Sequence, residues 1–270
     1  MKIAFLGGGN MANALIGGLL AKGFDARSIS VVDVSPAARE RVAAQHNVRV
    51  STAPDAATGG SDVLLLAVKP QDVRAALSGF PANLNEKLVI SIVAGVRLDT
   101  LSRWLGGHRR LVRCMPNTPA LIGAGVSGLY ALAEVGPAEK AKAETILGAV
   151  GEVVWLAEER LLDAVTAVSG SGPAYVFWFI EQLAAFAEQS GISRQHALKL
   201  ALHTVLGAAK LAATSADSPA ELKRKVTSRG GTTEAALEVF DAEQLAQRFA
   251  RALEAARKRG AALGDELGKD

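Results

Sequence analysis

The stretch KIAFLGGGNMA, residues 2–12, decides the fold of this chain. It begins with a short continuous apolar run, which is typical of a strand buried on both faces of a sheet. It ends in the pattern G-x-G-x-x-A, and a helical pattern follows over residues 10–22. In such a turn the first glycine allows the tight bend, the second lets a pyrophosphate approach the backbone, and the alanine keeps the helix close to the sheet. The N-terminus of the helix favours a phosphate ligand. The stretch therefore predicts a dinucleotide-binding turn rather than a glycine-rich turn without a ligand.

Strand and helix patterns continue to alternate after this turn. Strand candidates lie at Lys2–Leu6, Ser30–Asp33, Asp62–Ala67, Leu88–Ile92 and Leu111–Met115, with a further pair at Gly125–Tyr130 and Gly151–Leu156. Helical segments such as Asn10–Lys22 and Pro36–Gln45 lie between them. Strand–helix–strand repetition with short loops predicts a parallel sheet with right-handed crossovers. We expect an α/β Rossmann-type dinucleotide-binding domain over residues 1–162.

Helices dominate the remaining residues, 163–270, where we expect an all-α dimerisation and substrate-binding domain. The predicted helices are Pro173–Gln189, Arg194–Thr214, Pro219–Val226, Glu234–Val239 and Ala242–Arg259. Ser218 and Glu221 form a capping box with proline at the first helical position, and Asp241 with Gln244 predicts a second one.

The first two of these helices are apolar around most of their circumference. A helix of this kind has to be buried on all sides. About 108 residues cannot easily bury two such helices, so the pattern predicts that a second subunit packs against them. The alternative is that the N-terminal sheet covers them.

Composition excludes several classes of protein. The chain has 270 residues, a formal net charge of +3 and only short basic runs, so it lacks the long basic stripe expected of a nucleic-acid-binding protein. One cysteine, Cys114, sits in an apolar strand pattern and is expected in the core. No apolar stretch approaches the roughly 20 residues of a membrane span. The four histidines show no metal-binding spacing. We expect a cytoplasmic protein without a metal.

The end of the second strand bears on the choice of cofactor. Asp33 is an acidic residue of the kind that binds the ribose 2′-hydroxyl of NAD. Ser35, Arg39 and Arg41 follow closely and could instead bind the 2′-phosphate of NADP. These residues leave the preference between the two cofactors open.

Four further segments identify a family. They are AVKPQ at residues 67–71, MPNTP at 115–119, DAVTAVSGSGPAY at 163–175 and VTSRGGTT at 226–233. This set, in this order and across essentially the whole chain, resembles the pyrroline-5-carboxylate reductase family. The last two motifs are specific to that family, whereas the glycine-rich turn is shared by many dehydrogenases.

The resemblance implies reduction of the C=N bond of 1-pyrroline-5-carboxylate to L-proline, the last step of proline biosynthesis. It implies NADPH as the cofactor, with NADH as an alternative, and a homodimer formed through the C-terminal helices and joined into a ring of dimers. It places Thr166 at the ring nitrogen of the substrate and Ser228, Gly231, Thr232 and Thr233 at its carboxylate. The implied cofactor-binding residues are Leu6, Gly7, Gly8, Gly9, Asn10, Met11, Asp33, Ser35, Ala67, Val68, Lys69, Pro70, Ala94, Gly95 and Asn117. The chain departs from the family at Arg229, where proline is common, which puts the rigidity of that loop in doubt.

The motifs contain no residue poised as a general acid, apart from Asp163 one turn before Thr166. Positioning of a hydride donor contributes more to the rate than general acid–base catalysis does. In addition, an imine that arrives protonated is already activated. Reduction of such an imine therefore does not require a general acid in the motifs. Plain N-capping by Thr232 or Thr233 is the alternative to a carboxylate site. The alternative functions are a 3-hydroxyacid-type dehydrogenase, which would need a helical lysine such as Lys199 or Lys210, and a non-catalytic nucleotide sensor or pyridoxal-phosphate-binding scaffold.

Overall fold

The computed structural model describes residues 1–78, 84 and 87–269. Contacts between residues divide the chain into two compact units. The sheet unit comprises Met1–Ser171 together with the stretch from Ala256 onward, and the helical unit comprises Gly172–Ala255. The predicted boundary lay between residues 162 and 163. The units differ from it because residues 163–171 and the last turns of the final helix pack with the sheet.

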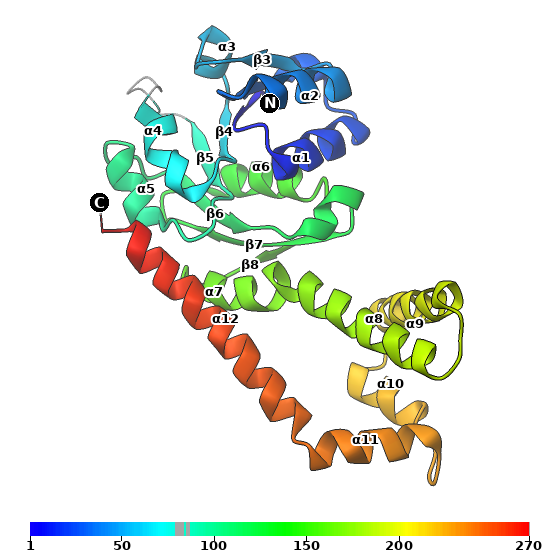
Figure 1. The fold of residues 1–270 in the computed structure, drawn as a ribbon. Helices are drawn as coiled ribbons and strands as arrows, with labels where there is room; N and C mark the ends of the chain where they lie inside the picture. Colours follow the sequence, from blue (N-terminus) through cyan, green and yellow to red (C-terminus); the bar gives the residue numbers. More distant parts are fainter. Residues whose placement is uncertain (79–83, 85–86, 270) are drawn as a thin grey trace. The chain divides into compact units, whose positions relative to one another are not determined.

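Eight strands of the described residues form one sheet, in the order β3-β2-β1-β4-β5-β6-β7-β8 (Figure 1). Neighbouring strands are parallel, except that β6 and β7 are antiparallel. The strands are β1 (Ile3–Leu6), β2 (Ile29–Val32), β3 (Arg49–Ser51), β4 (Val63–Leu66), β5 (Leu88–Ser91), β6 (Leu111–Met115), β7 (Gly125–Ala131) and β8 (Gly151–Trp155). The seven predicted strands are confirmed, and β3 was not predicted. The expected parallel sheet is corrected at one edge, where β7 and β8 run opposite to the other strands.

Helices follow most of the strands of the sheet unit. They are α1 (Asn10–Ala21), α2 (Pro36–His46), α3 (Ala56–Gly59), α4 (Val73–Ser78), α5 (Leu98–Trp104), α6 (Pro137–Leu147) and α7 (Leu161–Val165), with 3-10 turns η1 (Ala26–Ser28), η2 (Pro70–Asp72) and η3 (Thr118–Ile122) and a π-helical turn η4 (Thr166–Gly170). Local chemistry sets the bounds of α2. Ser35 accepts a hydrogen bond from the N–H of Ala38, Pro36 occupies the first position, and Asn47 ends the helix in a left-handed conformation.

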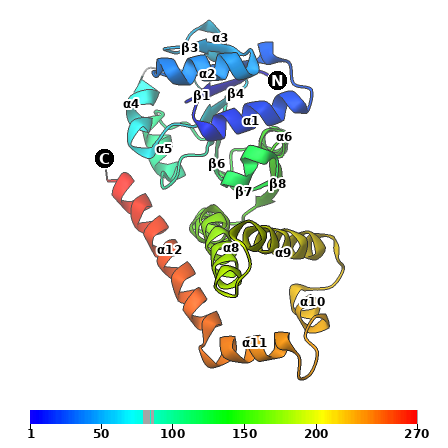
Figure 2. The same cartoon turned by 45° about the vertical axis from the view of Figure 1, so that its right-hand side comes forward.

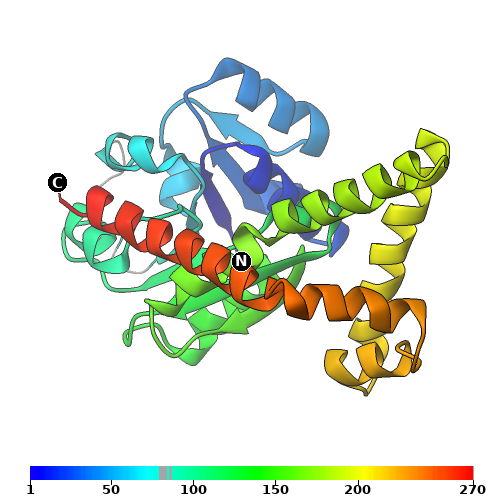
Figure 3. The same cartoon turned by 60° about the horizontal axis from the view of Figure 1, so that its bottom comes forward.

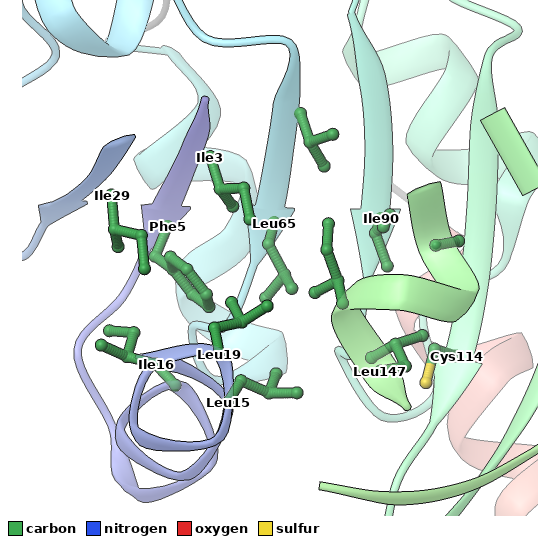
Figure 4. Packing of buried hydrophobic residues seen from close by; sticks show 14 of the residues in the cluster. Ile3, Phe5, Leu15, Ile16, Leu19, Ile29, Leu65, Ile90, Cys114 and Leu147 are labelled. Carbon is green, nitrogen blue, oxygen red and sulfur yellow. The ribbon is translucent and has the colours of Figure 1, made fainter. Parts of the chain in front are cut away.

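Alternate residues of the central strands pack into two hydrophobic clusters. Ile3 and Phe5 of β1 lie in one cluster with residues of α1 and α6 (Figure 4). Ala4 and Leu6 lie in the other with residues of α4 and α5. Side chains along a strand point to opposite faces, so both faces of the sheet are covered, which explains the continuous apolar runs in the sequence. Cys114 is buried in the first cluster, which confirms it as a core residue. This burial raises the pKa of its thiol to about 12.

The helical unit contains the helices that the sequence predicted. They are α8 (Gly172–Gln189), α9 (Arg194–Thr214), α10 (Pro219–Lys225), α11 (Thr232–Ala242) and α12 (Leu245–Leu267), of which α12 continues into the sheet unit as one helix (Figure 3). The capping box of Ser218 and Glu221 is confirmed. The predicted cap at Asp241 is wrong, because Asp241 lies inside α11 and the positive φ of Gln244 separates α11 from α12.

Helices α8 and α9 pack against each other within the helical unit (Figure 2). The residues of the two helices that are buried are small: Ala184 of α8, and Ala197 and Ala201 of α9. Most of the large apolar side chains of both helices stay exposed: Val176, Phe177, Trp178, Phe179 and Phe186 of α8, and Leu198, Leu200, Leu202, Leu206 and Leu211 of α9. Among the helices of the described residues, none has the length and apolarity that a membrane crossing requires.

Candidate active site

The glycine turn between β1 and α1 lies against the end of β4. Gly7 has a φ of +104°, and a Cβ at this position would lie 2.5 Å from the carbonyl oxygen of Ala67, so the turn requires glycine. A Cβ at Gly9 would meet nothing closer than the same oxygen at 3.9 Å. Gly9 is the N-cap of α1, and no side chain caps this helix. The first turn of α1 thus offers backbone N–H groups and open space in front of them, which fits a pyrophosphate.

The side chain of Asp33 accepts a hydrogen bond from the backbone of this turn. One carboxylate oxygen accepts a hydrogen bond from the N–H of Gly8 at 2.7 Å, and the other accepts from the N–H of Ser35 at 2.8 Å. Arg39 donates to the carbonyl oxygen of Asp33 at 2.7 Å, and Arg41 donates to that of Gly8 at 2.9 Å. The predicted acidic residue therefore supports the turn, while a hydroxyl and two guanidinium groups gather at the end of β2.

Asn13 supports the same turn and was not predicted. Its side-chain amide donates to the carbonyl oxygens of Gly8 and Gly9, both at 3.0 Å. Its oxygen lies 3.2 Å from Nε2 of His46, and burial lowers the pKa of that imidazole. Asn13 is one residue beyond the G-x-G-x-x-A pattern, so no motif pointed to it.

The next two predicted segments also follow strand ends, where an open sheet binds ligands. The N–H of Ala67 donates to the carbonyl oxygen of Leu6 at 2.8 Å, which fixes segment 67–70 beside the glycine turn. Ala94 is exposed after β5, and Gly95 has a φ of +78°. A Cβ at Gly95 would lie 3.0 Å from Leu267 of α12, so this loop is backed by the last turns of that helix.

Asn117 joins the end of β6 to η4. Its side-chain oxygen accepts from the N–H of Val126 at 2.9 Å, and its amide nitrogen donates to the carbonyl oxygen of Ser169 at 3.2 Å. The amide nitrogen carries two hydrogens, so one remains after this contact. Asn117 therefore fixes η4 relative to the strand ends.

Thr166 opens the π-helical turn η4. The N–H of Ser171 donates to the carbonyl oxygen of Thr166 at 2.8 Å, five residues back along the chain. The hydroxyl of Thr166 donates to the carbonyl oxygen of Leu162 at 2.8 Å. Its only hydrogen is thus used, and the oxygen keeps acceptor capacity. A single π turn inside a helix is frequently found at functional sites, and the sequence did not predict this one.

Asp163, which precedes Thr166 by one turn, belongs to a charged cluster that also contains Arg113 and Glu159. Arg113 of β6 is buried, and its guanidinium lies 4.0 Å from Asp163 and 3.1 Å from Glu159. Asp163 is thereby engaged by a cation within the sheet unit. Sequence motifs gave no signal for Arg113 or Glu159.

The predicted carboxylate loop lies in the helical unit, between α10 and α11. Gly230 has a φ of +70°, and its N–H donates to Glu234 at 2.6 Å. The N–H of Gly231 donates to the carbonyl oxygen of Ser228 at 3.0 Å. Gly231 is the N-cap of α11, and no side chain caps the helix.

The two threonines of the loop lie inside the helix that follows it. The threonines at 232 and 233 occupy the first two positions of α11. Capping by a threonine side chain, the alternative interpretation of this motif, is therefore wrong. Arg229 is exposed. The described residues contain no group of three or more His, Cys, Asp or Glu side chains placed to hold a metal ion.

Known proteins are similar to this chain over nearly its whole length. A model of pyrroline-5-carboxylate reductase dimerisation matches residues 159–263, and a model of coenzyme F420-dependent NADP oxidoreductase matches residues 2–95. Pyrroline-5-carboxylate reductase of Pseudomonas aeruginosa is 46% identical over 269 residues, which are 99% of this chain and 98% of the relative. The enzyme of Synechocystis is 43% identical over 98% of both chains.

Solved structures agree with these relatives. A pyrroline-5-carboxylate reductase from Coxiella burnetii superposes with a TM-score of 0.92 at 38% identity, covering 97% of this chain and 98% of the other. Pyrroline carboxylate reductase of Plasmodium falciparum with NADP bound superposes with a TM-score of 0.85 at 28% identity, covering 98% of each chain.

Proposed function

The chain belongs to the pyrroline-5-carboxylate reductase family, and on this premise we propose how its own residues bind and orient the reactants. The reaction is the NAD(P)H-dependent reduction of the C=N bond of 1-pyrroline-5-carboxylate to L-proline, which completes proline biosynthesis. When bound, the dihydronicotinamide supplies a hydride to the C=N carbon. The protein has to hold the two reactants together and stabilise the charge on the nitrogen.

The strand ends of the sheet unit hold the cofactor. Residues 6–11 bind the pyrophosphate through the open N-terminus of α1, because a helix N-terminus presents N–H groups and a partial positive charge to anions. Segments 67–70 and 94–95 contact the ribose on the nicotinamide side. Asn117 lies near the nicotinamide, with one amide hydrogen left for it after the contact with Ser169.

The end of β2 favours NADPH over NADH. Both carboxylate oxygens of Asp33 already accept backbone hydrogen bonds, so Asp33 is less available to a ribose hydroxyl. Ser35, Arg39 and Arg41 provide a hydroxyl and two cations, the groups that suit a 2′-phosphate.

Thr166 orients the substrate nitrogen as a hydrogen-bond acceptor. The observation that carries this proposal is the 2.8 Å hydrogen bond from its hydroxyl to the carbonyl oxygen of Leu162. Because that bond uses the hydroxyl hydrogen, the oxygen is left to accept the N–H of a protonated imine. A hydrogen bond to a charged group contributes about 1.5–3 kcal/mol. Thr166 thereby favours the protonated imine, the form that accepts a hydride, and no separate general acid is required.

The loop at residues 228–233 holds the substrate carboxylate. The hydroxyls of Ser228, Thr232 and Thr233 and the uncapped N-terminus of α11 are the donors, and Gly231 gives the backbone room to turn. The loop belongs to the helical unit.

The molecule works as a homodimer formed through α8 and α9. The support is the set of large apolar side chains left exposed on both helices, of which Phe186 is 72% exposed and Phe177 65% exposed. Exposed apolar surface of this extent marks an interaction site. Assembly of dimers into a ring and a cytoplasmic location stay predictions.

Oxidation of NADPH and NADH, followed by absorbance in the presence of 1-pyrroline-5-carboxylate, tests the reaction and the cofactor together. We expect turnover with both cofactors and a higher kcat/KM with NADPH. A protein that binds either cofactor but oxidises neither would contradict the function, and a higher kcat/KM with NADH would contradict the role given to Ser35 and Arg39.

A further inference from the structure

We propose that Glu159 is a positioning residue that ties the nicotinamide-side loop at residues 92–97 to the helix carrying Thr166. The proposal rests on the proposed function, because it takes Ala94, Gly95 and Thr166 as parts of the site. All of its contacts lie within the sheet unit.

One oxygen of Glu159 connects two separate segments. Its Oε1 accepts a hydrogen bond from the N–H of Leu98 at 2.8 Å and another from the guanidinium of Arg113 at 3.1 Å. The side chain of Arg113 is only 7% exposed and that of Glu159 is 22% exposed, so water screens this pair weakly. The contact therefore constrains geometry more than an exposed ion pair does.

The first partner sets the position of the cofactor loop. Leu98 is the first residue of α5, directly after the loop that contains Ala94 and Gly95. The N-cap residue Arg97 offers this helix no side-chain cap. Glu159, which is distant in sequence, supplies the missing acceptor, and its negative charge suits the N-terminus of a helix. Removal of Glu159 would free the end of the loop.

The second partner sets the position of Thr166. Arg113 also faces Asp163, which precedes Thr166 by one turn of helix. Met115, two residues after Arg113, lies so close to η4 that a Cβ on Gly170 would approach its methyl group to 2.6 Å. Loss of Glu159 would remove the shorter of the two ion pairs that the described residues show for the buried guanidinium of Arg113, and the 4.0 Å contact to Asp163 would remain. The strand and η4 would then shift to satisfy the guanidinium, because an uncompensated buried charge is strongly unfavourable.

The test compares Glu159→Ala with Glu159→Gln. The alanine variant loses both contacts, whereas glutamine keeps an oxygen that can accept from Leu98. We expect Glu159→Ala to lower kcat per NADPH-binding site by about 100-fold and to raise the KM for NADPH, because a misplacement of about 1 Å can cost that much in rate. We expect Glu159→Gln to recover part of kcat and most of the KM. A purely structural role would lower the melting temperature of both variants, but kcat and the KM for NADPH would not recover to different degrees in Glu159→Gln.

Glu134→Gln is the matched control. Glu134 pairs with Arg109 at 2.9 Å near the start of β6, but both side chains are about half exposed, so this variant should keep the wild-type kcat and KM. If Glu159→Ala does not fold, Glu159→Gln decides, and wild-type kcat and KM in that variant would overturn the proposal. If wild-type protein shows no turnover, the proposed function has failed, and the NADPH affinity of Glu159→Ala, which loses the contact with Leu98, still tests the loop contact.

Discussion

The two units of this molecule bury their apolar residues to very different degrees. Phe5 in the sheet unit is fully buried, whereas Phe186 in the helical unit is 72% exposed. The sheet unit covers both faces of its strands with its own helices. The buried residues of helices α8 and α9 are small, and most of their large apolar side chains stay exposed.

This difference teaches that similar apolar runs can have different structural consequences. The apolar runs in the strands are buried by other segments of the same chain. Much of the apolar surface of α8 and α9 stays exposed, and burying such surface is the main favourable contribution to association. We therefore expect mutations in the sheet unit to act on cofactor binding and chemistry, and mutations on α8 and α9 to act first on assembly.

The largest expected effect tests the exposed side of the comparison. Phe186→Glu should convert the proposed dimer to a monomer, because a charge placed in an apolar interface without a partner costs about 3–5 kcal/mol. Gln189→Glu, a change at another exposed position at the end of the same helix, should leave the dimer intact. Light scattering coupled to gel filtration measures both. A Phe186→Glu protein that remains dimeric at micromolar concentration would contradict the claim that the exposed apolar side chains of α8 and α9 form the interface.

The next effect tests the buried side. Gly7→Ala should weaken NADPH binding by up to about 100-fold, because the new Cβ overpacks the Ala67 carbonyl at a cost of about 1–3 kcal/mol and φ is positive. Gly23→Ala also has a positive φ but meets nothing within 4 Å. Gly23→Ala should therefore keep the NADPH affinity. Fluorescence titration distinguishes the two variants, and equal losses would show that the contact with Ala67 is not what matters.

A third prediction separates orientation of the substrate nitrogen from binding of its carboxylate. Thr166→Val should lower kcat by roughly 10- to 100-fold, which corresponds to loss of a hydrogen bond to a charged group. Thr233→Val should mainly raise the KM for 1-pyrroline-5-carboxylate. Steady-state kinetics with saturating NADPH measures both. Thr166→Ser should restore kcat, and a Thr166→Val protein with wild-type kcat and KM would exclude the role given to Thr166.

A smaller effect is expected at the cofactor phosphate. Arg39→Ala should raise the KM for NADPH by about tenfold, since a charged hydrogen bond contributes about 1.5–3 kcal/mol and Arg41 remains. The KM for NADH should change little. Arg27→Ala, at a highly exposed arginine of η1, is the control and should alter neither value. Equal changes with both cofactors would remove Arg39 from the 2′-phosphate site.

The smallest effects compare the capping boxes of the two units. Asp55→Ala and Ser218→Ala each remove an N-cap and should lower the free energy of unfolding by about 1 kcal/mol at neutral pH. The N–H of Thr58 is the main cause that lowers the pKa of Asp55. A lowered pKa stabilises the fold above the unfolded pKa, and this stabilisation is lost as pH falls through the folded pKa. The difference between wild type and Asp55→Ala in thermal unfolding should therefore shrink in acid, and a constant difference would contradict this assignment.

The sequence predicted the parts of the fold that depend on local pattern. The turn at Gly7, the strands around it and the bounds of α9 follow from short-range periodicity and glycine chemistry. Strand β3 was missed because it has three residues, of which Arg49 is exposed. The antiparallel direction of β7 was missed because strand direction depends on the path of the chain and not on composition.

The candidate site was predictable where a motif names its residues. Motifs named Thr166 and the loop at 228–233 as candidates, and their roles in binding stay predictions. The π turn at Thr166 and the cluster of Arg113 and Glu159 were not predicted, because they arise from contacts between segments that are distant in sequence. Likewise, Asp33 was predicted as a ligand for ribose, but its partners in the glycine turn are set by the folded backbone.

The course of α12 has a consequence for biosynthesis. The helix leaves the helical unit and ends in the sheet unit, where Leu263 and Leu267 lie close to Gly95 and Arg97 pairs with Asp265 at 2.8 Å. Domains usually fold in order as they leave the ribosome, at about 5–20 residues per second. Here the earliest unit to emerge receives its last helix only after the entire helical unit has been translated. A nascent chain stalled within α11 would carry a complete sheet but a cofactor loop without its backing, so NADPH affinity should mature late in synthesis.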